Sequence, residues 1–109
     1  MDYKTACDLL TQESSTTQPD AFLTRLQASH PPIPGQVTSL LLALKVVADR
    51  LKHDTVLERT LARSLFDLAY GSRQYYEDGR VRGAEWPPLL DEDLRRIAIA
   101  VRQIMAGVK

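Results

Sequence analysis

Two stretches of this chain place their apolar residues at the spacing of one helical face. Between residues 37 and 51, and again between 94 and 108, apolar side chains recur at positions i, i+3, i+4 and i+7. At about 100° per residue, each set occupies an arc of about 120°, which is typical of a helix that buries one side and exposes the other. The two sets are Val37, Leu40, Leu41, Leu44, Val47, Ala48 and Leu51, and Leu94, Ile97, Ala98, Val101, Ile104, Met105 and Val108. They predict helices over about 35–52 and 91–107 and an all-α fold.

Two short helices are predicted before these. Asp2 can cap a helix over 3–13, because its side-chain oxygen accepts a hydrogen bond from a free N–H group of the first turn. The polar run 14–17 then indicates a linker. Pro19 favours the start of a second helix, since the N–H that proline lacks has no partner at the first helical position. The proline-rich segment 30–34 should be extended.

A long helix is predicted from Asp54, its N-cap, to a fading end at 78–83. Gly71 in its interior costs about 1 kcal/mol relative to alanine, so it indicates a bend or a close helix crossing. Asp91 is the predicted N-cap of the last helix, and Gly107 its end. The apolar line of the long helix comprises Leu57, Leu61, Leu65, Leu68, Ser72 and Tyr75, widened by Ala62, Phe66, Ala69 and Tyr76. An arc of this width implies contact with more than one neighbouring helix.

These helices predict one domain over 1–109, a four- or five-helix, mainly antiparallel bundle. The three longer helices form its core, and the two short ones are a smaller covering pair. The longest uninterrupted apolar runs, 40–44 and 97–101, are far shorter than the ~20 residues that span a bilayer. The first residues lack the pattern of a signal peptide. We therefore expect a cytoplasmic protein without a membrane segment.

Composition argues against several kinds of chemistry. The 14 basic residues balance 14 acidic ones, and this balance argues against the clustered basic surface that neutralises phosphates, although it leaves room for a local basic patch. We therefore do not expect nucleic acid as a partner. Cys7 is the single cysteine, and His30 and His53 lie in or beside connectors, so no metal site is predicted. No phosphate-binding loop and no nucleophile elbow occurs in the sequence. We expect no cofactor and no catalytic residues.

One stretch concentrates arginines and aromatic residues. We call it the arginine–aromatic cluster, and its candidate ligand- or partner-binding residues are Tyr70, Arg73, Tyr76, Arg80, Arg82 and Trp86. Arginine beside tyrosine or tryptophan is typical of interface hot spots and of sites for anions or aromatic ligands. The same stretch is also compatible with a tapering helix end, in which Tyr75 and Trp86 close the bundle and acidic neighbours neutralise the arginines.

A second apolar seam lies on the opposite side of the helix over 35–52. Leu42 and Val46 lie about 140° and about 180° from Val37, and Ile99 occupies the equivalent outer position on the last helix. Either the helix is sandwiched between neighbours within the bundle, or these three residues contact a second copy of the chain. The outer seam therefore predicts a homodimer as one of two alternatives.

Two segments carry a resemblance to a known family. They are Pro32-Ile33-Pro34-Gly35-Gln36-Val37 and Glu85-Trp86-Pro87-Pro88-Leu89-Leu90-Asp91-Glu92-Asp93-Leu94. In this order and at this chain length, they resemble a small all-helical cyanobacterial family of undefined function, some members of which carry the label dethiobiotin synthetase. Enzymes of that label use a doubly wound sheet and a phosphate loop, and this sequence predicts neither. The resemblance therefore implies a helical fold and no catalytic or binding residues.

Three functions are compatible with these observations. The first is a non-enzymatic interaction or adaptor protein, self-associating as a homodimer, that docks partners through the outer seam and the arginine–aromatic cluster. The second is a small-ligand binding module, in which an arginine of the cluster holds an anionic group against Tyr76 or Trp86. The third is an enzyme of the kind that the label names, which the missing phosphate loop disfavours.

Overall fold

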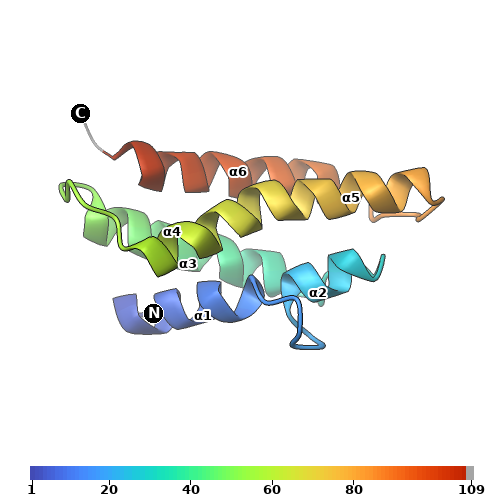
Figure 1. Ribbon diagram of the computed structural model, residues 1–109, viewed down its shortest axis with the longest axis horizontal. Helices are drawn as coiled ribbons and strands as arrows, with labels where there is room; N and C mark the ends of the chain where they lie inside the picture. Colours follow the sequence, from blue (N-terminus) through green and yellow to red (C-terminus); the bar gives the residue numbers. More distant parts are fainter. Residues whose placement is uncertain (108–109) are drawn as a thin grey trace.

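Five helices make up most of the chain in the computed structural model, which describes residues 1–107 (Figure 1). They are α1 (Tyr3–Glu13), α2 (Phe22–Gln27), α3 (Gln36–Leu51), the continuous rod of α4 (Arg59–Phe66), η1 (Asp67–Gly71) and α5 (Ser72–Val81), and α6 (Leu90–Ala106). The three long helices are α3, the rod and α6, so the predicted all-α bundle is confirmed. Val108, which completes the second predicted stripe, lies outside the described residues. Within 1–107, no helix has the length and apolar character that crossing a bilayer requires.

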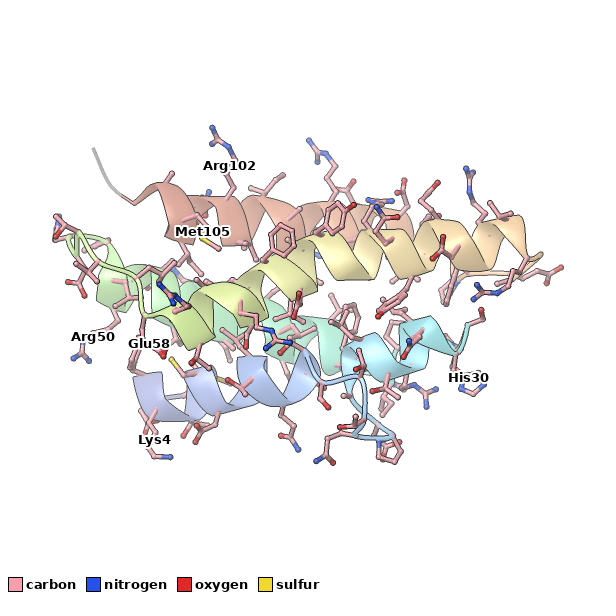
Figure 2. All side chains as sticks on the ribbon, viewed as in Figure 1. Lys4, His30, Arg50, Glu58, Arg102 and Met105 are labelled. Carbon is pink, nitrogen blue, oxygen red and sulfur yellow. The ribbon has the colours of Figure 1, made fainter. Side chains whose placement is uncertain are left out.

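The helices form four columns that lie side by side, with α1 and α2 end to end in one of them (Figure 1). Consecutive columns along the chain run in opposite directions, as predicted. α3 packs against α1 and α6, and the rod closes the ring by packing against α6 and against α1 and α2. Charged side chains such as Lys4 and Arg102 extend outward from these columns (Figure 2). The connection 52–58 therefore crosses one end of the bundle between diagonal columns.

The core lies along the common axis of the four columns. The centres of both predicted stripes are buried, with Leu44 and Ile97 fully enclosed, whereas Met105 at the edge of the second stripe is exposed. The two short helices also contribute to the core, which corrects the prediction that they are only a covering pair. Their buried apolar side chains are Ala6, Leu10, Phe22, Leu23 and Leu26.

The second helix begins three residues later than predicted. Pro19 lies in a turn closed by a hydrogen bond of 3.1 Å from Ala21 N–H to the Gln18 carbonyl. α2 then begins at Phe22, whose N–H donates to Glu13 Oε1 across 3.1 Å. The cap therefore comes from the end of α1, and a local rule for proline does not detect a cap that a distant side chain supplies.

The predicted N-cap of the rod is also wrong. Glu58 caps the rod in place of Asp54, whose own N–H closes a turn after α3. The Glu58 carboxylate accepts hydrogen bonds from the N–H groups of Leu61 and Thr60, at 3.1 and 3.2 Å. These hydrogen bonds, above all that from Leu61, favour the charged carboxylate and lower the pKa of Glu58.

For the last helix, the predicted N-cap is wrong and the predicted C-terminal end is confirmed. Leu89 is its N-cap, and Asp91 lies inside the first turn, where Arg73 of the rod holds its carboxylate. The charge of Asp91 still complements the helix dipole. At the other end, α6 stops at Gly107 with a φ of 70°, as predicted. Asp2 likewise caps α1 as predicted, by accepting an N–H hydrogen bond of 2.8 Å.

A buried pair of polar side chains joins the first three helices. Gln36 Nε2 donates to Glu13 Oε1 at 3.1 Å and to the Asp20 carbonyl at 2.9 Å, while Gln36 Oε1 accepts from Ile33 N–H at 3.0 Å. Burial raises the pKa of Glu13, against the opposing effect of the N–H groups of Phe22 and Gln36. The pair therefore holds the loop between α1 and α2 against the start of α3.

Candidate ligand pocket

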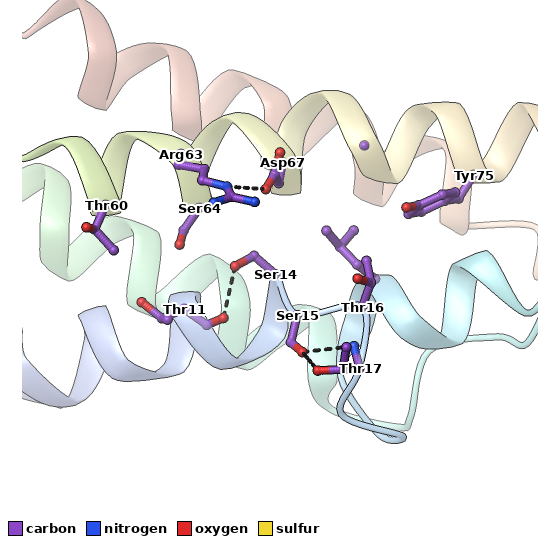
Figure 3. Close-up of a pocket in the computed structure, with 12 residues that line it drawn as sticks. Thr11, Ser14, Ser15, Thr16, Thr17, Thr60, Arg63, Ser64, Asp67 and Tyr75 are labelled. Atoms are coloured by element: carbon purple, nitrogen blue, oxygen red, sulfur yellow. Dashed lines mark hydrogen bonds and ion pairs between the residues drawn. The ribbon is translucent and has the colours of Figure 1, made fainter.

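A polar cavity of about 470 Å³ lies between the rod and the loop that follows α1 (Figure 3). We call it the hydroxyl pocket, because its walls carry eight hydroxyl side chains and two charged ones, Arg63 and Asp67. The hydroxyl residues are Thr11, Ser14, Ser15, Thr16 and Thr17 from α1 and its loop, and Thr60, Ser64 and Tyr75 from the rod. Leu23 and Gly71 complete the wall. The volume falls within the range of small-molecule sites.

The π-helical turn η1 directs one face of the rod toward this pocket. In an uninterrupted α-helix, Tyr75 would lie about 80° around the axis from Asp67. A π-helical turn adds one residue and so rotates everything after it back by about 100°, which brings Tyr75 to within about 20° of Asp67. The apolar pattern assumes an α-helix throughout and places Tyr75 in line with Leu68. The structure instead places Tyr75 in the pocket wall, where it is only partly buried.

Ser72 completes the π-helical turn. Its backbone N–H donates to the Asp67 carbonyl, five residues earlier, so the Leu68 carbonyl loses the partner that an α-helix would give it. The buried Ser72 hydroxyl donates to this Leu68 carbonyl. A side chain thus replaces the backbone hydrogen bond that the turn withdraws.

Ser64 is buried among these helices without a partner. It is 5% exposed, and its hydroxyl has no hydrogen-bond partner within residues 1–107. In Figure 3 the hydroxyl points from α4 into the space toward Ser14. Every fully enclosed side-chain polar atom in the described part of the chain has a partner, so the Ser64 hydroxyl is reached from the pocket.

The opposite wall is a loop that its own hydrogen bonds hold in place. Ser15 Oγ accepts from the N–H groups of Thr17 and Gln18, both at 3.1 Å. The Ser15 carbonyl accepts a hydrogen bond of 3.0 Å from the Thr24 hydroxyl at the start of α2. The segment 14–17, which the sequence indicates as a linker, is therefore an ordered wall.

The two charged side chains of the pocket, Arg63 and Asp67, have opposite charges and form an ion pair. Arg63 Nε lies 3.8 Å from Asp67 Oδ2, and both side chains are exposed. An exposed ion pair contributes only about 0–1 kcal/mol, so both groups remain available to a ligand. The lining contains no histidine, lysine or cysteine. Across residues 1–107, no three His, Cys, Asp or Glu side chains gather closely enough to hold a metal ion.

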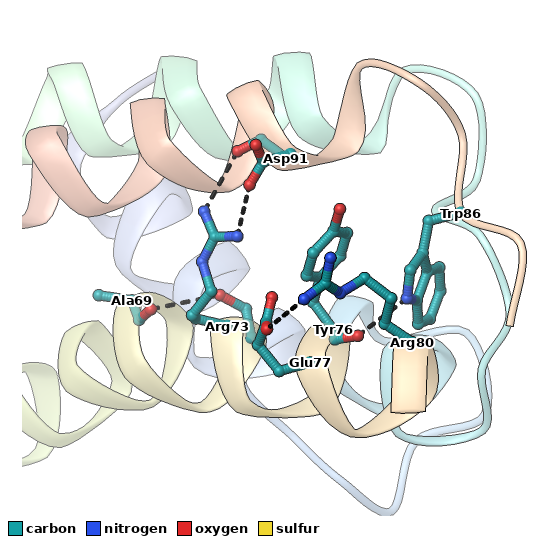
Figure 4. A network of polar contacts seen from close by, with 8 residues as sticks. Ala69, Arg73, Tyr76, Glu77, Arg80, Trp86 and Asp91 are labelled. Carbon is teal, nitrogen blue, oxygen red and sulfur yellow. Dashed lines mark hydrogen bonds and ion pairs between the residues drawn. The ribbon is translucent and has the colours of Figure 1, made fainter. Parts of the chain in front are cut away.

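The structure brings Arg73, Tyr76 and Trp86 of the arginine–aromatic cluster into contact at the far end of the rod (Figure 4). Arg73 pairs with Asp91 at 2.5 Å and lies over the Tyr76 ring, 5.2 Å from its centroid. The Tyr76 and Trp86 rings stack at 5.8 Å, and Trp86 Nε1 donates to the Tyr76 carbonyl at 2.9 Å. Gly79 lies beneath the indole, because a Cβ there would be 2.6 Å from Trp86 Cζ2.

The other two arginines of the cluster also have partners within the chain. Arg80 pairs with Glu77 at 3.3 Å, and Arg82 donates to Ser29 Oγ at 3.0 Å. None of the cluster residues lines the hydroxyl pocket. Ligand or partner binding by these residues stays a prediction.

Tyr70 lies apart from the rest of the cluster. Its ring stacks on that of Phe66 at 5.2 Å, and the two residues are 54% and 55% exposed. Its hydroxyl accepts a hydrogen bond of 2.7 Å from Gln74. Phe66, which was predicted to widen the buried stripe of the rod, is therefore on the surface, and that prediction is wrong.

The outer seam is largely exposed. Leu42 and Ile99 are 48% and 43% exposed, whereas Val46 is partly buried against the core. α3 and α6, which carry these residues, pack against each other. Contact of the seam with a second copy stays a prediction.

The two segments that carry the family resemblance meet in the fold. Pro32 and Ile33 from the first, and Pro87 and Leu89 from the second, line one groove of about 250 Å³. The chain matches no model of a known protein family, no curated protein and no solved structure. The resemblance therefore stays an expectation.

Sequence reasoning missed the hydroxyl pocket, although one signal for it was present. Thr60, Ser64, Asp67 and Gly71 have the spacing of a polar helical face beside the leucine line. The second wall, 14–17, lies far away in the sequence. Without the fold, nothing indicates that the two polar segments face each other.

Proposed function

We propose that this is a non-enzymatic binding protein that holds a small polar molecule in the hydroxyl pocket. The observation that carries the proposal is the Ser64 hydroxyl, which belongs to a residue only 5% exposed, opens on the pocket and has no hydrogen-bond partner among residues 1–107. Because solvent reaches this hydroxyl through the pocket, water can pair with it in the free protein. A ligand in the pocket would take the place of that water.

The chemistry of the lining supports binding in preference to catalysis. A serine or threonine acts as a nucleophile when a neighbouring base takes its proton. The lining has no histidine or lysine, and its one carboxylate, on Asp67, lies beside Arg63. The proposal keeps the ligand-binding module that the sequence suggests, but moves its site from the arginine–aromatic cluster to the pocket. The cytoplasm stays the predicted location.

The test compares the wild type with a variant whose pocket is filled. A Cβ on Gly71 would lie 3.8 Å from its nearest neighbour, Leu23 Cδ1, so there is room for the first atom of a side chain. Because Gly71 lines the pocket, we expect the rest of the side chain in Gly71→Leu to extend into it. Each protein is incubated with a small-molecule extract of cells, washed, and analysed by mass spectrometry for retained compounds. We expect the wild type and the control Thr5→Leu, on the exposed side of α1, to retain a compound that Gly71→Leu loses. Equal retention by all three proteins would contradict the proposal.

A second candidate function, self-association as a homodimer, rests on the exposed outer seam. Leu42 and Ile99 lie on two helices that pack against each other, so a second copy would cover both. Leu42→Glu would then produce a folded monomer, because the new charge is buried without a partner only in the dimer. Light scattering measures this change. A wild-type protein that is monomeric at high concentration would contradict the homodimer.

A further inference from the structure

We propose that the ligand of the hydroxyl pocket is an uncharged polyhydroxylated molecule of the sugar or polyol class, an inference that rests on the proposed function. Three wall hydroxyls are engaged within the chain, because Ser14 donates to the Thr11 carbonyl at 2.9 Å and the hydroxyls of Ser15 and Thr17 bond to each other at 3.1 Å. Each of the other wall hydroxyls can donate one hydrogen bond and accept others. These belong to Thr11, Thr16, Thr60, Ser64 and Tyr75. Ligand hydroxyls have the same double capacity, so such a ligand can pair with the wall in either direction. A phosphate or carboxylate group offers acceptors alone and would leave the lone pairs of the wall hydroxyls unused.

The charged pair in the pocket favours the same class. Because Arg63 Nε lies 3.8 Å from Asp67 Oδ2, a ligand group that reaches one charge is also close to the other. An anion would be attracted by the guanidinium and repelled by the neighbouring carboxylate, and a cation would meet the reverse. An uncharged ligand hydroxyl interacts favourably with both side chains, since it can accept a hydrogen bond from Arg63 and donate one to Asp67.

The remainder of the wall matches the C–H groups of such a ligand. Tyr75 and Leu23 supply its apolar part. In Figure 3 the Tyr75 ring extends from the rod with its hydroxyl toward the cavity. A tyrosine therefore presents an apolar ring and a polar tip at the same place. A sugar or polyol alternates C–H and O–H groups in the same way.

The test titrates isotope-labelled protein with D-glucose, D-sorbitol and D-gluconate and follows the backbone amides by NMR. Sorbitol and gluconate are both open chains of six carbon atoms but differ in charge, so this pair isolates the effect of a carboxylate. We expect glucose or sorbitol to shift the amides of 14–17 and 60–75. Its affinity should exceed that of gluconate by at least about tenfold.

Two variants separate the parts of this inference. Ser64→Ala removes one hydrogen bond to the ligand and is expected to weaken binding of the uncharged probe by about three- to tenfold. Asp67→Asn keeps a side-chain oxygen but removes the negative charge, so gluconate binding should strengthen toward that of glucose. Both variants are first checked for a wild-type amide spectrum outside the pocket.

The outcomes distinguish the ligand class from the proposed function. Preferential binding of gluconate, or a charged compound among those that the wild type retains and Gly71→Leu loses, would overturn the sugar or polyol class and leave the proposed function intact. An uncharged polyhydroxylated compound retained in the same way would support the class even where none of the three probes binds. Equal retention by the wild type and Gly71→Leu would contradict the proposed function, and it would therefore contradict this inference as well.

Discussion

The hydroxyl pocket and the arginine–aromatic cluster lie on the same rod, but their polar groups are satisfied in different ways. In the cluster, Arg73 reaches Asp91 and Trp86 donates to the Tyr76 carbonyl, so these groups already have partners. In the pocket, Ser64 has none among residues 1–107. Composition therefore shows where polar and aromatic residues gather, whereas packing shows which of them are free to bind.

The largest expected effect comes from a matched pair of glycines, one in each region. A Cβ on Gly79 would lie 2.6 Å from Trp86 Cζ2, so Gly79→Ala should displace the indole and cost about 1–3 kcal/mol. At Gly71 the nearest atom would be 3.8 Å away, so Gly71→Ala should instead stabilise the helix by up to about 1 kcal/mol. Urea titration measures both changes, and Trp86 fluorescence reports the cluster alone. Equal effects at the two glycines would contradict the contrast between a filled and an open region.

A comparable loss is expected for Ser72→Ala. This variant leaves the buried Leu68 carbonyl without the hydroxyl that now donates to it, at a cost of about 1–3 kcal/mol. The NMR signals of Tyr75 should also change, because the π-helical turn sets the orientation of its ring toward the pocket. A loss below about 0.5 kcal/mol with unchanged Tyr75 signals would show that Ser72 does not hold the turn.

A smaller effect is expected from Glu13, which anchors the loop side of the pocket. Its folded pKa lies above the ordinary value of 4.5, so the folded state binds this proton more tightly than the unfolded state does. The stability that Glu13 contributes is therefore present at low pH and is lost as the pH rises from about 4.5 through its folded pKa. The lowered pKa of Glu58 has the opposite sign, and its contribution is lost as the pH falls below 4.5.

Glu13→Gln tests this sign. The glutamine keeps an oxygen that accepts from Phe22 N–H but does not titrate. We expect the stability of the variant, measured by urea titration relative to the wild type, to increase between about pH 4 and about pH 7. A difference that stays constant over this range would show that burial does not raise the pKa of Glu13.

The smallest effect on stability is expected for Ser64→Ala. Because the Ser64 hydroxyl has no partner within residues 1–107, its removal should change the free energy of unfolding by less than about 0.5 kcal/mol. Alanine also has the higher helix propensity, so the change should favour the fold. Ser72→Ala is the matched comparison, since it removes a hydroxyl that has a partner. A loss above about 1 kcal/mol would show that the fold itself uses the Ser64 hydroxyl.

The parts of the fold that depend on near neighbours in the sequence were predictable. The start of α1 follows from Asp2 and the end of α6 from Gly107, because each signal lies within one turn of the end that it sets. The start of α2 depends on Glu13, nine residues earlier, so rules that use only near neighbours in the sequence do not predict it. The same rules do not predict the π-helical turn, because it depends on which carbonyl accepts the hydrogen bond of the Ser72 hydroxyl.

The candidate site was less predictable than the fold. Composition singled out the cluster but could not show that Arg73 and Trp86 are engaged within the chain. It also grouped Tyr70 with them, although the Tyr70 ring stacks on the exposed Phe66, which is outside the cluster. The pocket needs two polar segments from distant parts of the chain, and α-helical periodicity places Tyr75 away from it.

The π-helical turn also shifts the helical register of the rod by one residue. The residues before Asp67 and those after Gly71 follow the same repeat of about 3.6 residues per turn, but one residue out of step. That offset orients Tyr75 toward the pocket, and it equally orients Arg73 toward Asp91 at the far end. Deleting one residue within 67–71 would rotate both arrangements together. The orientations of both sites therefore depend on the same π-helical turn, although the two sites have no residue in common.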